Sequence, residues 1–403
     1  MPTAGIAPKT LPTLFQGTAP RLSRLCCIGL SPHLHNRFPN LTHLYLYEGS
    51  VFPGRGDHAA TSWHGVHDAT PFLPAFLDFL EGAPGLEELV LVHRSAASWC
   101  TCGKCRKDPE ELAGRRVRMP RLRRITFGEY AWANAGRILR YVVPAKRVTV
   151  QTDGAEGHTG NFMYDVLSLL TPDAGFLGHL AGITEVALWL REGQHCVRCR
   201  GPECELTLNL VHARIPDNTQ RVTWYAVTLR REYPAMFAHA VAAALDLRRV
   251  VDLSVQMDSW GLLSVQDAQA LFSSMPTVQR CTLWMDPRIH RSYWQRCLSK
   301  ADVPFPELRT LHFVCNMPKD WRPWEILGLA IRRAKRGRRL EEVKLTAVAS
   351  EGSVPSFVRW DVDALQVGGK RLLDYVGSLR FEQVTITSLM KAPVLKHWDG
   401  CLL

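Results

Sequence analysis

Two clusters of cysteines are the residues of this chain best suited to bind a metal ion. Their side chains are, in chain order, Cys100, Cys102, Cys105, His195, Cys196, Cys199 and Cys204. Each cluster contains a Cys-x-x-Cys step, which lets two thiolates reach one tetrahedral ion, usually Zn²⁺. Cys102, Cys105, Cys196 and Cys199 could share one structural zinc, or each cluster could close its own site, with His195 completing the second. The alternative is that both clusters are reduced thiols without a cofactor.

Both clusters follow segments that we predict to be strands, ending near Leu91 and Leu188. We therefore expect each cluster to lie in a loop inserted between repeated elements. The two strands are separated by about three repeats, so roughly 15 Å at about 4.8 Å per parallel strand, a distance that long loops can span.

Catalytic chemistry has weaker support in the sequence. Gly-x-Ser-x-Gly, the phosphate-binding P-loop and His-Glu-x-x-His are all absent from the sequence, although each is typical of a large enzyme class. We expect no catalytic residues and a protein that is not an enzyme.

The elements that must position these residues repeat along the chain. A short lead-in containing Pro is followed by Leu-x-x-Leu-x-Leu, as in residues 38–46 and again in residues 305–313. The last part of this unit alternates with period two, which predicts a short strand with one buried face. We count about twelve units, and their uneven spacing indicates insertions on the outer side.

The apolar positions of the twelve units predict which residues are buried. In order they are Leu22/Leu25/Cys27, Leu41/Leu44/Leu46, Leu86/Leu89/Leu91, Leu122/Ile125/Phe127, Ala145/Val148/Val150, Ile183/Val186/Leu188, a degenerate unit at Val227 and Leu229, Val250/Leu253/Val255, Val278/Cys281/Leu283, Leu308/Leu311/Phe313, Leu340/Val343/Leu345 and Phe381/Val384/Ile386.

Helices are predicted between the strands. Apolar residues at helical spacing indicate them near residues 71–82, 136–142, 162–170, 234–245, 264–272 and 324–336. Strand and helix alternate with short connections, so the sheet should be parallel. A doubly wound sheet should have long apolar strands and a Gly-rich phosphate loop, which this sequence lacks. The prediction is an α/β leucine-rich-repeat solenoid, with strands on a concave face and helices on the convex face.

The repeat pattern divides the chain into five parts. Residues 1–20 form an N-terminal extension, and residues 21–190 form the first half of the solenoid with a Cys-bearing insertion at 95–118. Residues 191–230 break the rhythm and are interpreted as a Cys-rich insertion followed by a hairpin-like segment. Residues 231–390 form the second half, and residues 391–403 a tail.

These units resemble the divergent repeats of fungal F-box-type proteins, whose strands are also introduced by Phe-Pro-x-Leu or Met-Pro-x-Leu. The resemblance covers nearly the whole chain and implies a repeat array that recruits substrates to a cullin-type ubiquitin ligase. We find no F-box, because residues 11–15 are too short and run directly into the first unit. The possible ubiquitin-ligase adaptor is therefore implied by resemblance alone.

Residues between the buried strand positions should face outward and contact a partner. The residues we expect to do so are Tyr45, Tyr47, Trp189, Trp284, His312 and Lys344. Tyr and Trp anchor many protein interfaces, whereas a nucleic-acid surface should carry Lys and Arg. The alternative is that the tryptophans pack under insertions.

The prediction is therefore a protein-binding scaffold. The alternative is a zinc-stabilised basic repeat protein that binds nucleic acid in the nucleus, suggested by the formal net charge of +11. The sequence contains no apolar run long enough for a membrane helix and no secretory signal, so we expect no membrane partner and a cytoplasmic or nuclear location.

The densest basic run, at residues 332–339, has two interpretations. It could be a nuclear-import signal, or it could place cations in the last turn of a helix that ends near Gly337. We favour the helix end, because Gly suits the position just after a helix.

Overall fold

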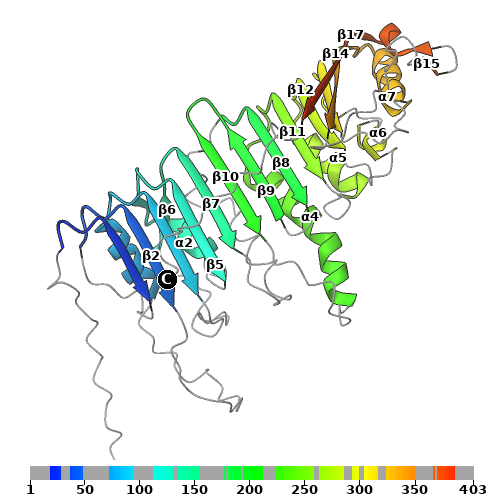
Figure 1. Ribbon diagram of the computed structural model, residues 1–403. Coiled ribbons are helices and arrows are strands. Elements are labelled where there is room, and N and C mark those ends of the chain that lie inside the picture. Colours follow the sequence, from blue (N-terminus) through cyan, green and yellow to red (C-terminus); the bar gives the residue numbers. More distant parts are fainter. Residues whose placement is uncertain are drawn as a thin grey trace, which may run out of the picture. The chain divides into compact units, whose positions relative to one another are not determined.

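The computed structural model describes sixteen segments of the chain, and every structural statement below concerns them. They are residues 19–28, 37–48, 72–93, 112–129, 135–153, 177, 180, 182–191, 194–211, 224–257, 263–285, 293–298, 304–315, 324–349, 366–367 and 370–385. The chain has an α/β fold with mostly parallel strands (Figure 1). It divides into two compact units, unit 1 at Met1–His179 and unit 2 at Leu180–Leu403.

Unit 1 contains a row of parallel strands. In spatial order they are β1 (Arg24–Ile28), β2 (His43–Glu48), β3 (Glu88–His93), β5 (Arg124–Glu129) and β7 (Arg147–Asp153). Two helices cover one face, α1 (Phe72–Glu81) and α2 (Ala135–Tyr141). A separate short pair joins β4 (Val117–Arg118) to β6 (Val142–Val143).

Unit 2 contains a longer row of strands in the order β10-β9-β8-β11-β12-β13-β14-β17. Their bounds are β8 Glu185–Arg191, β9 Gln194–Arg200, β10 Glu205–Val211, β11 Asp252–Met257, β12 Arg280–Met285, β13 Thr310–Cys315, β14 Leu340–Ala349 and β17 Val376–Thr385. Only β9 runs antiparallel to its neighbours among these described strands.

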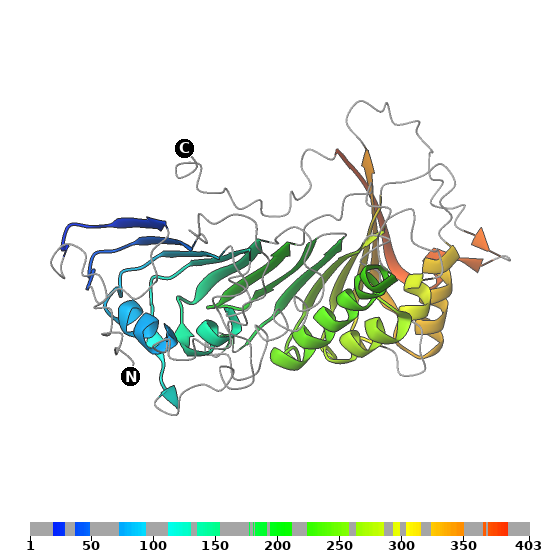
Figure 2. The same cartoon turned by 90° about the horizontal axis from the view of Figure 1, so that it is seen from below.

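The helices of unit 2 lie on one side of its strands, as those of unit 1 do on theirs (Figure 2). They are α4 (Trp224–Ala244), α5 (Val265–Ser273), α6 (Tyr293–Cys297) and α7 (Trp324–Lys335), followed by β15 (Gln366–Val367), β16 (Lys370–Arg371) and η7 (Leu372–Asp374). We call the other side of each sheet its open face.

The lead-in of several repeat units forms a tight turn. The N–H of Leu41 donates to the carbonyl of Phe38 at 3.0 Å, and the N–H of Leu308 donates to Phe305 in the same way at 3.1 Å. A Pro follows the acceptor residue in both turns, where its fixed φ suits the second position of a β-turn. The Pro therefore bends the chain just before the strand.

Successive units join through a repeated pair of hydrogen bonds at the strand entrance. The N–H groups of Glu87 and Glu88 both donate to the carbonyl of Thr42, at 2.8 and 3.0 Å. In unit 2, Arg309 and Thr310 both donate to Gln279, each at 2.9 Å. The same step recurs between other neighbours, so it sets one register for several strands in each unit.

Ten of the twelve predicted units fall in observed strands, with their last two apolar residues buried. The predicted helices at 71–82, 136–142, 264–272 and 324–336 correspond to α1, α2, α5 and α7. The predicted helix at 162–170 lies outside the described residues, and α6 was not predicted.

The predicted positions of two repeat units were wrong. Val227 and Leu229 belong to α4, which begins at Trp224 and continues through Pro234. In the last unit, Phe381 lies opposite Leu345, and Leu379 lies opposite Val343. The unit therefore begins at Val376, five residues before the predicted start at Phe381.

The segment predicted as an insertion at 191–230 is also different. Its first part forms β9 and β10, which are full members of the unit 2 sheet. The predicted hairpin-like segment contains one strand, β10, whereas residues from Trp224 onward belong to α4. The compact units divide between His179 and Leu180.

Candidate functional site

Four of the predicted partner-binding residues lie on the open face of unit 2. They are Trp189, Trp284, His312 and Lys344. Ser254, Thr282, His312 and Lys344 lie directly opposite one another across β11, β12, β13 and β14. We call this the middle row, and its outer members are Ala187 on β8 and Arg380 on β17. The next row along the same face is Trp189, Gln256, Trp284, Val314, Thr346 and Glu382.

The residues of these two rows differ in how much surface they offer. Trp189 is 6% exposed and Thr346 is 3% exposed, so both contribute little area to a partner. Trp284, His312 and Lys344 are half-buried. The accessible part of the site therefore consists of one tryptophan, one imidazole and one cation beside small middle-row side chains.

His312 is held in place from its neighbouring strand. Its Nε2 lies 2.7 Å from the hydroxyl oxygen of Thr346. Burial lowers the pKa of His312 below its usual value, and the positive charge of Lys344 lowers this pKa further. Because a buried imidazole favours its uncharged form, His312 acts at neutral pH as a polar contact without charge.

Cations on this face are largely neutralised by carboxylates of adjacent strands. Lys344 Nζ lies 2.5 Å from Glu382, and Arg380 Nε lies 2.8 Å from Glu342. Arg280 pairs with Asp252 in the same manner. This face therefore alternates in charge and presents no uniform positive surface.

Tyr45 and Tyr47 lie on the open face of unit 1, so they form a set separate from the residues above. They occupy neighbouring rows, with Tyr45 opposite Val90 and Tyr47 opposite Val92. Both tyrosines are half-buried.

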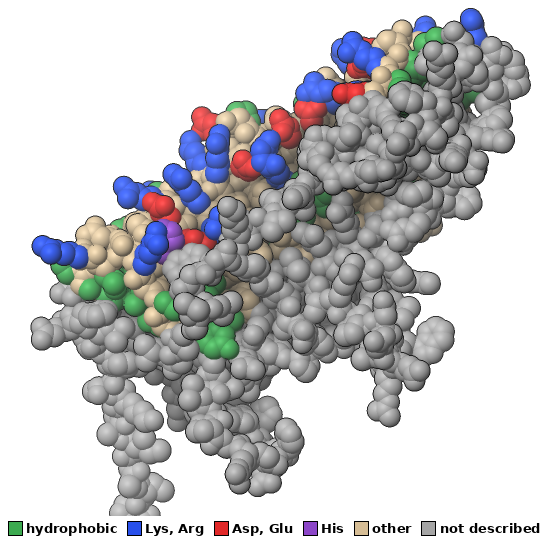
Figure 3. Space-filling model, in the orientation of Figure 1, with side chains coloured by type: hydrophobic (Ala, Val, Ile, Leu, Met, Phe, Trp, Pro, Cys, Tyr) green, Lys and Arg blue, Asp and Glu red, His purple; other side chains and the backbone are tan. Residues whose placement is uncertain are grey.

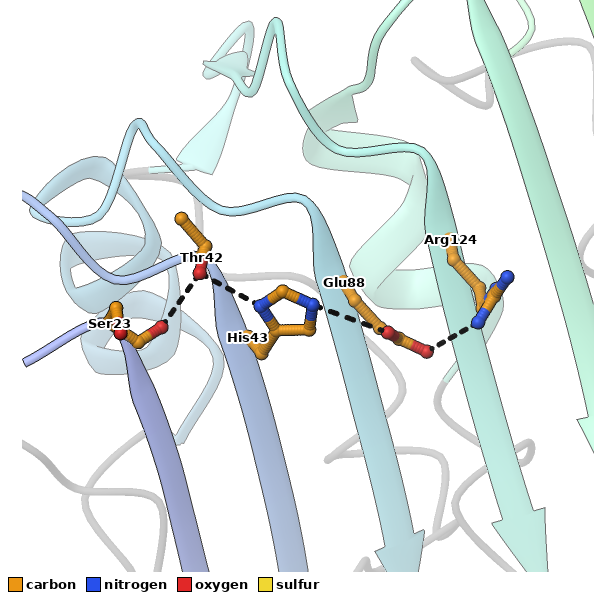
Figure 4. A network of polar contacts seen from close by, with 5 residues as sticks. All are labelled: Ser23, Thr42, His43, Glu88 and Arg124. Carbon is orange, nitrogen blue, oxygen red and sulfur yellow. Dashed lines mark hydrogen bonds and ion pairs between the residues drawn. The ribbon is translucent and has the colours of Figure 1, made fainter. Parts of the chain in front are cut away.

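A chain of polar contacts crosses the strand entrances of unit 1 beside these tyrosines (Figure 4). The Thr42 hydroxyl donates to the carbonyl of Ser23 at 2.9 Å and lies 2.8 Å from Nδ1 of His43. Nε2 of His43 faces Glu88 at 3.8 Å, and Arg124 donates to Glu88 at 3.0 Å. The contacts link four neighbouring strands or their lead-ins. His43, Glu88 and Arg124 therefore lie side by side along this edge.

The second cysteine cluster does not lie in a loop. Cys196 and Cys199 belong to β9 and are 1% and 0% exposed. Cys196 lies opposite Trp189 on the open face, whereas Cys199 lies opposite Val186 on the helix side. Side chains three residues apart on a strand point to opposite faces, so these two thiols are not placed to hold one ion.

The two other predicted zinc ligands, Cys102 and Cys105, lie outside the described residues. Within the described residues no group of three or more metal-binding side chains occurs. Burial raises the pKa of the Cys196 thiol to about 12 and that of the Cys281 thiol to about 12. Since the thiolate is the reactive form, both behave as small apolar side chains at neutral pH.

A Ser, an Asp and a His also meet on the helix side of unit 2. Ser264 Oγ donates to Asp267 at 2.5 Å, and Asp267 Oδ1 lies 2.9 Å from Nε2 of His239. Ser264 is the N-cap of α5 and accepts from the N–H of Asp267. The hydroxyl contacts the carboxylate and not the imidazole, so His239 is not positioned as a base for Ser264, and the group caps a helix.

Sequence reasoning missed Glu382, the carboxylate partner of Lys344, and the neighbouring Arg380, which pairs with Glu342. Arg380 and Glu382 lie on β17, where the predicted register was five residues late and placed them outside the strand. The alternation of charge in Arg380-Phe381-Glu382 was the available signal, because it indicates a strand with one polar face.

Comparisons with protein-family models, with curated proteins and with solved structures found no match to this chain. No helix among the described residues is long and apolar enough to cross a membrane.

Proposed function

We propose that this chain is a non-catalytic scaffold whose unit 2 open face binds another protein. The main support for this proposal is the strand register. It places Trp284 beside the middle-row residues Thr282 and His312, on a face without described helices. A half-buried Trp with small and polar neighbours supplies contact area and hydrogen-bonding groups together, as protein interfaces require.

The charge pattern favours protein over nucleic acid on this face. A surface for a phosphate backbone needs cations that are available to replace counterions. Here Lys344, Arg380 and Arg280 are each engaged by a carboxylate. The nucleic-acid alternative has no comparable support on this face, and the positions of Cys196 and Cys199 on opposite faces of β9 do not support a zinc ion held by this pair.

We further propose that the repeats form a leucine-rich-repeat solenoid and that the bound protein is a substrate for a cullin-type ubiquitin ligase. The recurring turn and the recurring double hydrogen bond between units support a repeat architecture. The ligase part rests on the resemblance to F-box-type repeats.

Replacing Trp284 by alanine is expected to weaken partner binding by about tenfold or more, because truncating a hot-spot Trp commonly costs about 2 kcal/mol or more. The measurement is affinity purification with the tagged full chain, quantified by mass spectrometry and followed by titration of the purified partner. Arg338→Ala, at an exposed position in the turn after α7, is the control. Proteins retained equally by both variants would argue against this face.

The ligase proposal has its own outcome in that experiment. Recovery of a cullin and its adaptor with the wild-type chain supports it. Partners that depend on Trp284, recovered without adaptor or cullin, would remove the ligase role and leave the binding scaffold.

Acidification is expected to destabilise unit 2 through His312. The pKa of His312 in the folded chain is below the unfolded value of 6.5, so the unfolded chain binds the proton more readily. The stability that the neutral imidazole contributes is therefore present above about pH 6.5 and is lost as pH falls. Urea midpoints at about pH 7 and about pH 5 measure the loss.

The matched pair of variants for this pH dependence is His312→Asn and His239→Asn. His312→Asn should reduce the acid-induced fall in the urea midpoint. His239 lies half in solvent beside Asp267, so His239→Asn should leave the contribution of His312 in place. An unchanged acid response in His312→Asn would show that other groups cause it.

A further inference from the structure

Unit 1 carries a concentration of cations on the turns that lead into β5 and β7. They are Arg118, Arg121, Arg123, Lys146 and Arg147, and all five are exposed. We call these residues the edge patch. Figure 3 shows Lys and Arg side chains, with some Asp and Glu between them, along the edge at which the strands begin.

The fold requires these side chains to be exposed. Val117, Met119 and Leu122 are 1%, 0% and 0% exposed, and they anchor the segment in the core. Arg118, Arg121 and Arg123 alternate with these anchors and so point to solvent. Their exposure is therefore set by the lead-in turn of the repeat and does not depend on a free loop.

Backbone hydrogen bonds bring the two turns side by side. The N–H of Met119 donates to Val143 at 2.8 Å, and that of Ala145 donates to Leu122 at 3.1 Å. The N–H of Thr149 donates to Arg123 at 2.8 Å. Neighbouring strands are about 4.8 Å apart, so the cations of the two turns form one cluster.

The four arginines of the edge patch are not paired with carboxylates within the described part of the chain. Arg118, Arg121, Arg123 and Arg147 form no ion pair there, in contrast to the cations of the unit 2 open face. The nearby carboxylates Asp78 and Glu81 are both engaged by Arg115, at 2.6 and 3.0 Å.

The edge patch is short. Toward β3 it ends at Glu87, whose carbonyl accepts from the N–H of Arg123 at 2.8 Å, and Glu88 beyond it is paired with Arg124. Its width is therefore two neighbouring turns. A duplex would need a longer run of cations to contact many phosphates, whereas a short acidic segment needs only a compact group.

We propose that the edge patch binds an acidic segment of a protein partner, rich in Asp and Glu. Guanidinium groups present paired donors that match a carboxylate, which favours Arg over Lys at such a surface. This site is independent of the proposed function, because it lies on unit 1 and involves none of the unit 2 open-face residues.

The test measures fluorescence anisotropy of a labelled Glu-rich peptide with the full chain. The patch variant is Arg118→Gln/Arg121→Gln/Arg123→Gln/Arg147→Gln. The control variant, Arg249→Gln/Arg296→Gln/Lys335→Gln/Arg338→Gln, removes the same net charge from exposed positions of unit 2. We expect Kd to rise at least about tenfold in the patch variant and less than about twofold in the control, because several exposed charge contacts each contribute a small factor.

Salt and a competing ligand complete the test. Binding should weaken between about 50 mM and about 300 mM salt, as exposed charge contacts are screened. Trp284→Ala should leave peptide binding unchanged, which separates this site from the unit 2 open face. Absence of binding at low salt would overturn the proposal, as would equal losses in both quadruple variants. Tighter patch-dependent binding of single-stranded nucleic acid would reassign the site to that ligand.

Discussion

Truncating Phe272 to alanine is expected to lower the free energy of unfolding of unit 2 by about 3–5 kcal/mol. Phe272 lies on α5 and is 0% exposed. Its ring packs against Phe305, with centroids 5.0 Å apart and ring planes at 46°. Phe305 belongs to the lead-in turn of β13, so the pair joins a helix to the repeat unit that follows it. Removing one ring leaves a cavity between rigid elements that cannot collapse fully.

Urea unfolding followed by tryptophan fluorescence measures this loss. Leu373→Ala is the control for removing a large apolar side chain, because Leu373 is 38% exposed and should cost well under half as much. Phe272→Leu should fall between the two, since it keeps most of the buried volume. A loss in Phe272→Ala no greater than in Leu373→Ala would show that the contact does not stabilise unit 2.

The core positions were predictable because each repeat unit places apolar residues at the same spacing in the sequence. In Leu308, Leu311 and Phe313, a turn residue and two alternating strand residues all point to the helix side, and each is at most 3% exposed. Period-two alternation is local, so sequence reasoning finds it without knowledge of neighbouring strands. The α/β class and the parallel sheet follow from this alternation and the helices between the strands.

The position of the last unit was predicted wrongly because its residue types differ from those at the same positions of the other units. Its observed buried start is Val376, followed by Gly377, which resembles a loop residue in sequence. A Cβ at position 377 would lie 2.6 Å from the carbonyl oxygen of Glu341, so the strand requires Gly there. Phe381 is 41% exposed. Because it is apolar, it was predicted to be the first buried residue of the unit, and the predicted register was therefore wrong.

Segment 191–230 was misread for two further reasons. His195, Val197 and Cys199 alternate as one buried face of β9, but the cysteines were weighed as metal ligands. Pro234 was taken as a helix start, since Pro suits the first turn, whereas α4 passes through it. In both places tertiary packing overrides a local signal.

The candidate site was predictable only in part. Alternation within one strand placed Trp284 and His312 on the open face. The contact between His312 and Thr346, and the pairing of Lys344 with Glu382, depend on the register between different strands. That register comes from backbone hydrogen bonds between units, which a single sequence does not display.

Replacing Arg333 by methionine is expected to destabilise unit 2 by about 1–3 kcal/mol. Arg333 lies on α7 and is 2% exposed. Its Nη2 donates to the carbonyls of Phe305 and Leu308, at 3.1 and 3.2 Å. Burial lowers the pKa of Arg333 to about 10, which still leaves it charged at neutral pH. Methionine keeps much of the apolar stem, so the difference reports mainly the donors lost to the β13 turn.

The same basic run supplies the control for Arg333. α7 ends in a Schellman turn, in which Gly337 at φ +71° donates to Ala334 and Arg338 donates to Arg333. The side chain of Arg338 is exposed, so Arg338→Met should change stability by less than about 0.5 kcal/mol. A buried charge also carries a desolvation cost. If Arg333→Met is as stable as the wild type, that cost equals the gain from both hydrogen bonds. A clear loss means instead that the buried guanidinium is a structural link between α7 and the turn that positions His312.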